Sequence, residues 1–256
     1  METRGRVVVV TGGAGGIGAA LCRRFAADGA EQVVVSDIDA QAAAAVAAEI
    51  GGTAVPADVA VESDVERLVA TTMKAHGRID IYCSNAGIAF GGGPEASDTG
   101  WRQSWDVHVM AHVYAARALL PGMQERAEGY IVGTISAAAL LNHILAAPYA
   151  VTKAAGLSFF EWMAIAYHDQ GIRVSALCPQ GVRTAMLAKG GERNFLTSGA
   201  LGPEQVADAV VEAMRDERFL ILPHPDVGEF FLRKASDYDR WLKGMRRLRG
   251  RILAEQ

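Results

Sequence analysis

The amino-acid sequence predicts an α/β protein, a doubly wound and mostly parallel sheet of about seven strands with helices on both faces. Short β-branched runs such as VVVV at 7–10 alternate with longer segments of helical pattern. Such alternation is typical of strands joined by right-handed helical crossovers. Half of the 256 residues are hydrophobic, and no linker, repeat or low-complexity segment separates them. We therefore expect a single domain over residues 1–256, with its ligand site beyond the carboxyl ends of the strands.

The expected elements follow one another in a regular order. Runs rich in Val, Ile, Thr and aromatic residues indicate strands at 7–10, 32–36, 53–58, 79–84, 129–135, 172–177 and 219–223. Helical periodicity between them indicates helices near 16–28, 40–49, 61–76, 101–126, 149–169 and 203–216. The first helix begins in a glycine-rich turn, and the second is rich in alanine. Because a helix lies between each expected strand and the next, we expect neighbouring strands to be parallel.

Charge and composition favour a soluble protein that binds a small molecule. The formal net charge is -4, so there is no basic field to hold nucleic acid phosphates. Cys22, Cys83 and Cys178 are odd in number and far apart, which predicts buried thiols in a reducing compartment. The chain shows no secretory signal and no apolar run of bilayer-spanning length, so we expect a cytoplasmic location. His108 and His112 have helical spacing but no third ligand, so we expect no metal.

A glycine-rich turn, TGGAGGIG at 11–18, joins the first predicted strand to the first helix. Glycines at such a place allow a tight turn and the close approach of a pyrophosphate to backbone N–H groups. Glycine also collects in loops for conformational reasons alone, but its position here indicates a dinucleotide site. The residues expected at this site are Gly12, Gly15, Gly16, Ile17 and Gly18.

Asp37 follows the second strand, about twenty residues beyond the turn, where its carboxylate could accept hydrogen bonds from an adenosine ribose. The same charge would repel a 2′-phosphate, and neither the turn nor Ile38 supplies a compensating base. NAD is therefore favoured over NADP as the cofactor. The alternative is that Asp37 is an ordinary residue of a turn at the strand end.

The stretch YAVTK places Tyr149 and Lys153 four residues apart, on one face of a predicted helix. On its own this spacing also fits an ordinary helix surface. Together with the glycine turn, SNAG at 84–87, Ser136 and PQGVRT at 179–184, it resembles the short-chain dehydrogenase/reductase family over nearly the whole chain. In that family these segments correspond to TGxxxGxG, NNAG, the catalytic Ser-Tyr-Lys and PGxVxT.

The resemblance implies a Rossmann-type fold, a homodimer or homotetramer, and roles for individual residues. It places Asp58 and Val59 at the adenine and the backbone of 85–87 at the adenosine ribose. It also places the 179–184 segment at the nicotinamide, with Val182 and Thr184 at its carboxamide. The residues implied beyond the glycine turn and Asp37 are Ile38, Asp58, Val59, Asn85, Ala86, Gly87, Tyr149, Lys153, Pro179, Val182 and Thr184.

The chemistry expected of this set is hydride transfer between NAD(H) and a secondary alcohol or ketone. Tyr149 would act as the acid and base, although the usual pKa of a phenol is about 10, so a nearby positive charge such as Lys153 must favour phenolate. Ser136 would donate a hydrogen bond to the substrate oxygen. An alternative from another class is an NAD(H)-binding regulatory protein that has lost catalysis.

Two residues depart from the family pattern. His108 stands where the family has an Asn associated with a water that links the Lys to solvent. His108 could hold the same water, with added pH sensitivity near roughly 6 to 7, or it could simply pack. Gln180 stands where the family has Gly after Pro179, which could alter the wall around the nicotinamide or substrate.

The last segments are expected to shape the substrate side. Glycines and the apolar residues Met186, Leu187, Phe195 and Leu201 indicate a lid at about 185–202 and a moderately hydrophobic substrate. An amphipathic helix is expected at about 228–250, with bases on its polar side. This helix would pack on its own subunit or across a homo-oligomer, with an anionic membrane surface as the alternative.

Overall fold

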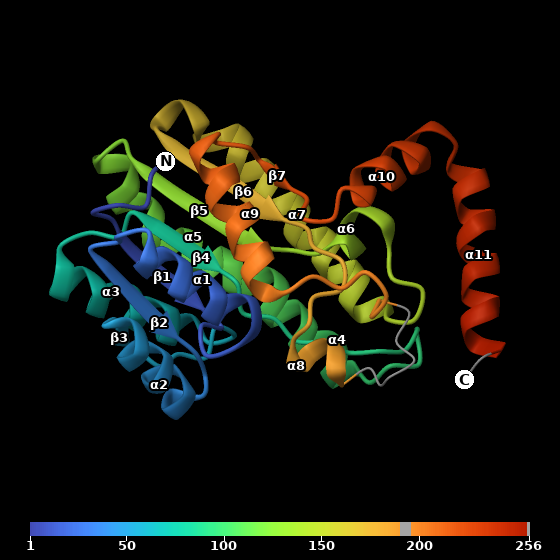
Figure 1. Ribbon diagram of the computed structural model, residues 1–256, viewed down its shortest axis with the longest axis horizontal. Coiled ribbons are helices and arrows are strands. Elements are labelled where there is room, and N and C mark those ends of the chain that lie inside the picture. The colour runs from blue at the N-terminus through green and yellow to red at the C-terminus, as the bar shows by residue number, and fades with distance from the viewer. Residues whose placement is uncertain (190–195, 255–256) are drawn as a thin grey trace.

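The computed structural model of the protein describes residues 1–189 and 196–254 and has a seven-stranded sheet at its centre (Figure 1). The strand order is β3-β2-β1-β4-β5-β6-β7, and all neighbouring strands are parallel. The chain winds outward from β1 to β3 on one side and from β4 to β7 on the other. The predicted doubly wound sheet is confirmed, and its winding reverses between β1 and β4, where a ligand crevice is expected.

The strands occupy the predicted places. They are β1 Val7–Thr11, β2 Gln32–Ser36, β3 Thr53–Ala54, β4 Ile81–Ser84, β5 Gly129–Thr134, β6 Ile172–Leu177 and β7 Leu220–Ile221. The two edge strands, β3 and β7, are shorter than predicted. Pro56 has no backbone N–H, but bonds to the β2 side continue around it, from the Val55 N–H to the Val35 carbonyl at 3.0 Å and from the Ala57 N–H to the Asp37 carbonyl at 3.1 Å.

Helices cover both faces of the sheet. Those that follow the successive strands are α1 Gly16–Ala27, α2 Ala40–Ile50, α3 Glu62–His76, α5 Ala111–Glu125, α7 Ala147–Tyr167 and α9 Pro203–Arg215. Shorter segments are α4 Asp98–Trp105, α6 Ala137–Leu141, α8 Ala185–Ala188 and the 3₁₀ turn His168–Gln170. The chain ends in α10 Asp226–Ser236 and α11 Tyr238–Ala254.

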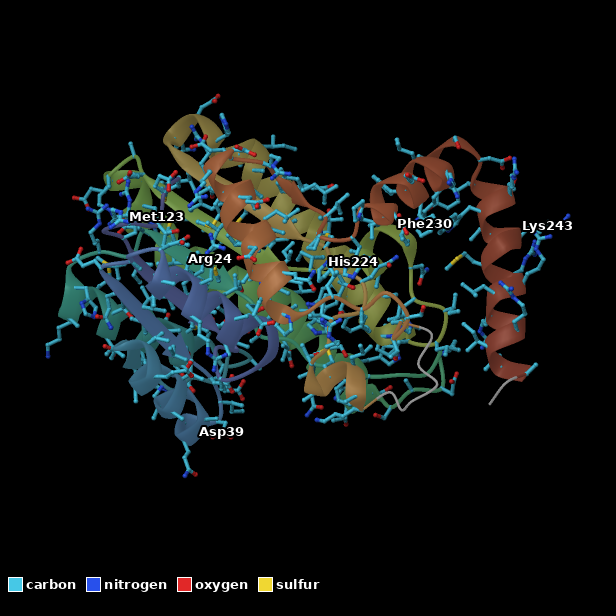
Figure 2. All side chains as sticks on the ribbon, viewed as in Figure 1. Arg24, Asp39, Met123, His224, Phe230 and Lys243 are labelled. Carbon is cyan, nitrogen blue, oxygen red and sulfur yellow. The ribbon has the colours of Figure 1, made fainter. Side chains whose placement is uncertain are left out.

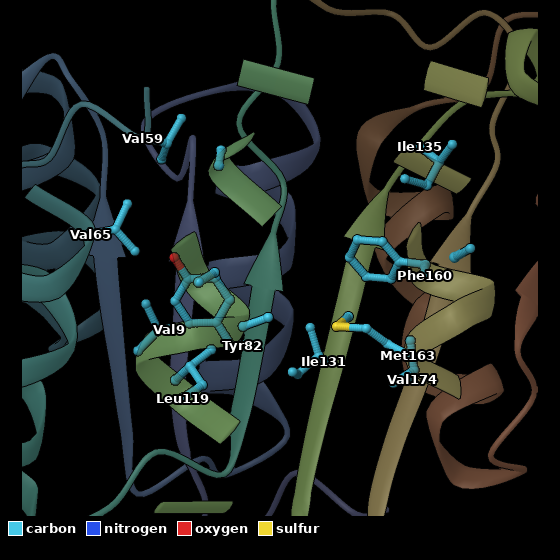
Figure 3. Close-up of a cluster of buried hydrophobic side chains, with 14 of the residues drawn as sticks. Val9, Val59, Val65, Tyr82, Leu119, Ile131, Ile135, Phe160, Met163 and Val174 are labelled. Carbon is cyan, nitrogen blue, oxygen red and sulfur yellow. The ribbon is translucent and has the colours of Figure 1, made fainter. Parts of the chain in front are cut away.

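Successive side chains of a strand point to opposite faces, and this alternation divides the core into two layers. Val9 lies in the layer covered by α3, α5 and α7, whereas Val8 lies in the layer covered by α1, α2 and α9. Figure 3 shows part of the first layer, where Tyr82 of the sheet and Leu119 and Phe160 of the helices are buried. Burying a side chain the size of Phe160 stabilises the fold by roughly 2–3 kcal/mol.

The cysteines behave as the sequence predicts. Cys22, Cys83 and Cys178 are all buried and free, and each belongs to one of the two core layers.

The predicted continuous helix over 101–126 is divided into three parts. Ser97 caps α4 by accepting a hydrogen bond from the Gly100 N–H at 3.1 Å. A π-helical turn, Asp106–Met110, then separates α4 from α5. A π turn contains one more residue than an α turn, so it shifts the helix face that points inward. This shift occurs at His108, one of the two residues that depart from the family pattern.

The prediction of one C-terminal helix at about 228–250 is wrong, because the helix breaks at Asp237. The backbone of Asp237 is not helical, and its carboxylate accepts from the Arg240 N–H at 2.9 Å, as a helix N-cap does. The second helix, α11, stands at the edge of the molecule beyond α6 (Figure 1). Within the described ranges, every helix is too short or too polar to span a bilayer.

Candidate active site

The carboxyl ends of β1, β4 and β5 are tied together by the side chain of Asn85. Its Nδ2 donates to the carbonyl of Thr11 at 2.9 Å, and its Oδ1 accepts from the hydroxyl of Thr134 at 2.9 Å. The backbone N–H groups of Asn85 and Ala86 both donate to Oγ1 of Thr11, at 3.0 and 3.2 Å. This edge of the sheet is therefore organised by the chain itself, at the place where the winding reverses.

Two glycines of the turn are required by the chain's own packing. Gly12 has a φ of +63°, and a Cβ added there would lie 2.8 Å from Cα of Ala86. A Cβ on Gly18 would lie 2.0 Å from the carbonyl oxygen of Gly12. Only glycine lets the start of α1 approach the end of β1 this closely.

Gly15 differs from them, because the described chain does not need a glycine there. A Cβ on Gly15 would meet no atom within 4 Å, and Gly15 precedes α1 without a side-chain capping bond. Beside it, Gly16 faces Thr184, and Ile17 packs against the core. Open space next to uncapped N–H groups is what a pyrophosphate requires, so these residues fit the phosphates of a dinucleotide.

The carboxylate of Asp37 is held at the end of β2 by two backbone groups. Its Oδ2 accepts from the Ala14 N–H at 3.1 Å, and its Oδ1 accepts from the Asp39 N–H at 3.1 Å. The neighbouring Ile38 is 72% exposed. An oriented carboxylate beside an uncovered apolar side chain fits the ribose and adenine of a nucleotide.

The next two residues assigned to the adenine pocket differ in their accessibility. Asp58 is partly exposed, and its Oδ1 accepts from the Ala60 N–H at 2.9 Å. Val59 is buried in the core layer under α3, so chiefly its backbone is left for a ligand (Figure 3).

The structure brings Ser136, Tyr149 and Lys153 together at this edge. Ser136 follows β5 and accepts from the Ala138 N–H at 3.1 Å, while Tyr149 lies in the first turn of α7. Nζ of Lys153 lies 5.8 Å from the centre of the Tyr149 ring and donates to the carbonyl of Thr134 at 2.8 Å. A Cβ on Gly87 would lie 3.6 Å from the same Nζ, so the segment after β4 faces Lys153 as well.

Burial governs the ionisation of both groups. It raises the pKa of Tyr149 above its ordinary value, and a hydrogen bond with the Ser136 side chain acts in the opposite direction. Burial also lowers the pKa of Lys153 to about 8. Burial by itself therefore favours the protonated phenol. The expected shift of Tyr149 toward phenolate, caused by Lys153 and an oxidised nicotinamide, stays a prediction.

His108 is buried, and both of its ring nitrogens have partners in the chain. Nδ1 lies 2.8 Å from Oγ1 of Thr152, and Nε2 accepts from the Ile88 N–H at 3.2 Å. Because the Thr152 hydroxyl donates to the Pro148 carbonyl at 2.7 Å, the ring must donate from Nδ1. The ring also meets the Tyr149 ring edge-on, with centroids 5.5 Å apart.

This arrangement corrects the expected titration of His108 near pH 6 to 7. Burial, with a smaller contribution from the charge of Lys153, lowers the pKa of His108 to about 2. The ring is therefore neutral at physiological pH. It links the loop after β4 to the turn that carries Tyr149.

The sequence did not point to His224, which holds the Pro179 segment in place. His224 follows β7 and is buried near the start of the C-terminal helices (Figure 2). Its Nδ1 accepts from the Gln180 N–H at 3.2 Å, and its Nε2 lies 3.1 Å from the carbonyl oxygen of Gly181. The departure at Gln180 is thus accommodated by backbone bonds to a histidine 44 positions later in the chain. No local pattern predicts such a partner.

The other residues expected near the nicotinamide lie along the same segment. The Pro179 carbonyl accepts from the Ala137 N–H at 2.8 Å, which joins this segment to Ser136. Val182 is buried and forms a bridge with Leu201, and the Thr184 hydroxyl donates to the Val182 carbonyl at 3.2 Å.

The expected lid at about 185–202 is only partly described. It begins with α8, and Met186 is exposed there, whereas residues 190–195, with the predicted contact Phe195, lie outside the described residues. A cleft of about 690 Å³ separates Gly16 and Thr184 from the start of α9. It adjoins the proposed phosphate position.

The two histidines with metal-ligand spacing have other contacts. Nδ1 of His112 lies 2.7 Å from Oγ of Ser84, and His108 is bonded as described above. In the part of the chain that the structure describes, no three His, Cys, Asp or Glu side chains gather as metal ligands.

Known proteins with similar sequences are dehydrogenases. The family model "short chain dehydrogenase" matches residues 6–194. The chain is 36% identical to a 1-deoxy-11-beta-hydroxypentalenate dehydrogenase of Streptomyces exfoliatus, over 88% of this chain and 86% of the relative. It is 39% identical to a 2,5-dichloro-2,5-cyclohexadiene-1,4-diol dehydrogenase of Sphingobium indicum, over 73% of this chain and 77% of the relative.

Solved structures agree with these sequence matches. A short chain dehydrogenase/reductase from Burkholderia phymatum in complex with NAD superposes with a TM-score of 0.86 at 28% identity, over 93% of this chain and 96% of that one. A 3-ketoacyl-(acyl-carrier-protein) reductase from Brucella melitensis complexed with NADH superposes with a TM-score of 0.80 at 26% identity, over 87% and 98% of the two chains. With its sheet order, its glycine turn and the cluster at Tyr149, the chain belongs to the short-chain dehydrogenase family.

Proposed function

We propose that this protein is an NAD(H)-dependent oxidoreductase that interconverts a secondary alcohol and its ketone, with Tyr149 as acid and base. The observation that carries the proposal is the grouping of Ser136, Tyr149 and Lys153 at the edge of the sheet where the winding reverses. A protein that only senses a dinucleotide needs no acid and base centre at this place.

Each residue of the cluster has a separate task. A bound nicotinamide cofactor supplies or accepts the hydride, and its oxidised ring adds a positive charge to the site. Tyr149 removes the hydroxyl proton in oxidation and returns it in reduction. Ser136 donates a hydrogen bond to the substrate oxygen, and the cation of Lys153 favours the phenolate. Because burial alone raises the pKa of Tyr149, oxidation should become faster as the pH rises through the alkaline range.

His108 acts as a positioning residue in this proposal. It joins the Ile88 backbone to Thr152, one turn after Pro148, and its ring supports the Tyr149 ring. A neutral ring whose two nitrogens are both hydrogen-bonded keeps the phenol in place and passes no proton on. The water relay that the family pattern suggested would therefore need a route other than the His108 nitrogens.

NAD is the proposed cofactor, and NADP is expected to be a poor substitute. The oriented carboxylate of Asp37 can accept hydrogen bonds from the ribose hydroxyls and would repel a 2′-phosphate. The solved relatives that contain NAD or NADH support this choice.

The proposed substrate is a moderately hydrophobic alcohol or ketone. Relatives named for a hydroxypentalenate and for a cyclohexadiene diol support an alcohol group on a carbon-rich skeleton. The exposed Met186 in α8 would provide apolar contact on the substrate side.

We also propose a homo-oligomer, because α7 carries an uncovered apolar face. Val151, Trp162 and Ile165 are 50%, 56% and 83% exposed. Exposed large apolar side chains that gather on one helix face indicate a protein interface.

Replacing Tyr149 with Phe tests the function directly. Tyr149→Phe should lower kcat for the best alcohol in an NAD-linked screen by about two to four powers of ten. NADH binding, measured by fluorescence, should persist because the ring remains. The matched control is Tyr167→Phe, which removes a phenol from the far end of the same helix and should leave kcat unchanged.

Two results would contradict the proposal. If Tyr149→Phe kept near wild-type kcat, Tyr149 would not be the acid and base. If the wild-type chain bound NADH but turned over no member of a broad alcohol and ketone panel, the regulatory alternative would replace the enzyme.

A further inference from the structure

The C-terminal arm, defined here as residues 237–254, makes few contacts with the rest of its own chain. None of its described residues is buried, although α11 is 17 residues long. In Figure 1 it stands apart from the layers that cover the sheet. Its attachments include the Phe230 and Trp241 rings, with centroids 6.3 Å apart, and a 3.1 Å hydrogen bond from Nε of Arg249 to the Ile144 carbonyl.

The arm has uncovered apolar surface. Tyr238, Leu242 and Leu253 are 56%, 48% and 43% exposed. A cleft of about 830 Å³ lies between α11 and the loop before α7, and its apolar lining includes Ile144 and Leu242. An uncovered helix face next to an open cleft of this kind indicates a binding surface for a macromolecule.

The arm and the rest of the chain carry opposite charges. The arm, residues 237–254, contains six basic residues and two acidic residues, a formal charge of +4. Subtracting this from the -4 of the whole chain leaves -8 on the remaining residues. Several of the bases, among them Arg246 and Arg249, line the cleft.

A basic helix could bind an anionic bilayer, a nucleic acid or an acidic protein surface. The opposite charges of arm and body favour one of these partners. An anionic bilayer or a nucleic acid would attract the arm but repel the body that carries it. The body of a second copy attracts the arm, and its own arm is attracted in return. A twofold arrangement satisfies both contacts at once.

We propose that the C-terminal arm docks on the body of a second copy of this chain. Docking also holds α11 against the loop at 142–146, through Arg249 and Ile144. That loop leads directly into α7, and the His143 ring lies 6.2 Å from the Tyr149 ring. Association would therefore fix one wall beside the candidate active site.

The first test is the mass of the protein in solution, which does not depend on the proposed oxidoreductase activity. A chain that ends at Ser236 keeps α10 and the Lys234 bond to the Leu140 carbonyl. Its far-ultraviolet circular dichroism and cooperative thermal unfolding should show that the body still folds. In sedimentation equilibrium it should lose one association step that the full chain makes.

A matched pair of single substitutions separates docking from general electrostatics. Arg246 lines the cleft, whereas the neighbouring Arg247 does not belong to its lining. Arg246→Glu should weaken association at least tenfold, and Arg247→Glu should weaken it less than threefold. Raising the salt concentration should weaken wild-type association more than that of Arg246→Glu.

Three results would overturn the proposal. One is an unchanged mass distribution for the chain ending at Ser236, or a full chain that is a monomer at every concentration. Another is equal weakening by the two arginine substitutions. The third is sedimentation with phosphatidylglycerol vesicles that disappears on truncation while the solution mass stays the same, which would assign the arm to a membrane surface.

Discussion

The glycine turn and the C-terminal arm are packed in opposite ways within one chain. At the turn, Gly12 and Gly18 touch neighbouring backbone, and Asn85 joins three strand ends by hydrogen bonds to groups that are far apart in sequence. In the arm, Leu242 and most of the bases face solvent or an open cleft. The turn is thus organised by its own chain before a ligand arrives, whereas the arm leaves its apolar surface uncovered. Substitutions at the turn should reduce folding stability or cofactor binding, and substitutions in the arm should reduce association.

Within the glycine turn, the largest expected effect on stability is at Gly18. A Cβ there would lie 2.0 Å from the Gly12 carbonyl oxygen and 2.6 Å from Nδ2 of Asn85. Backbone must move to relieve this overlap, so Gly18→Ala should lower the free energy of unfolding by about 3 kcal/mol. Chemical denaturation measures this change.

Gly15→Ala is the matched control for that substitution. The added Cβ meets no atom of the chain within 4 Å, so stability should change by less than about 1 kcal/mol. The Cβ would occupy the space proposed for the pyrophosphate, and NADH affinity should fall about tenfold, which corresponds to about 1.4 kcal/mol. If Gly15→Ala bound NADH with wild-type affinity, the proposal that the pyrophosphate lies beside Gly15 would be wrong.

A smaller effect on the free energy of unfolding is expected from Lys153, because burying its charged ammonium group destabilises the folded chain. Burial lowers its folded pKa to about 8 from an ordinary value of 10.5, which corresponds to about 3 kcal/mol. The unfolded chain binds more protons between these two values, so wild-type stability should rise as pH increases from 8 to 10.5. Below pH 8 the buried Lys153 is charged, and the full loss of about 3 kcal/mol in the free energy of unfolding is present.

Lys153→Met removes this cost and also removes the hydrogen bond to the Thr134 carbonyl, which is worth about 1 kcal/mol. At pH 7 the variant should therefore be more stable than wild type by about 1–2 kcal/mol, while its kcat falls steeply. The advantage should shrink toward pH 10.5. Guanidinium unfolding of both proteins at pH 7 and pH 10 tests this, and an advantage that does not depend on pH would contradict the assignment of the shift to Lys153.

Features that depend on neighbours in sequence were predictable, and features that depend on distant partners were not. The parallel sheet follows from the alternating runs. The positions of Gly12 and Asp37 follow from their distances to predicted strand ends, and that of Tyr149 from its helical spacing to Lys153 and the family motifs. Their roles as ligands stay predictions. The break at Asp237 had a local signal in its capping side chain, which the longer hydrophobic pattern concealed.

The π turn and His224 show why the remainder could not be predicted. One extra residue in a turn does not disturb a hydrophobic period enough to be recognised, yet this turn carries His108, whose buried ring bonds to Thr152. His224 bonds to backbone groups at 180 and 181, and a backbone acceptor or donor leaves no trace in the sequence. The pKa of His108 is governed by its burial, so it could be judged only after the packing was known.

The smallest effect on folding is expected in the arm. Leu242 is 48% exposed, so Leu242→Ala should change the free energy of unfolding of the body by less than about 0.5 kcal/mol. The same substitution at the fully buried Leu68 of α3 should cost about 2–5 kcal/mol. If the arm docks on a second copy, Leu242→Ala should nevertheless weaken association several-fold, because it removes apolar surface from the cleft. If Leu242→Ala and Leu68→Ala lowered the free energy of unfolding equally, the arm would be packed into the core of its own chain. The contrast between the glycine turn and the arm would then be wrong.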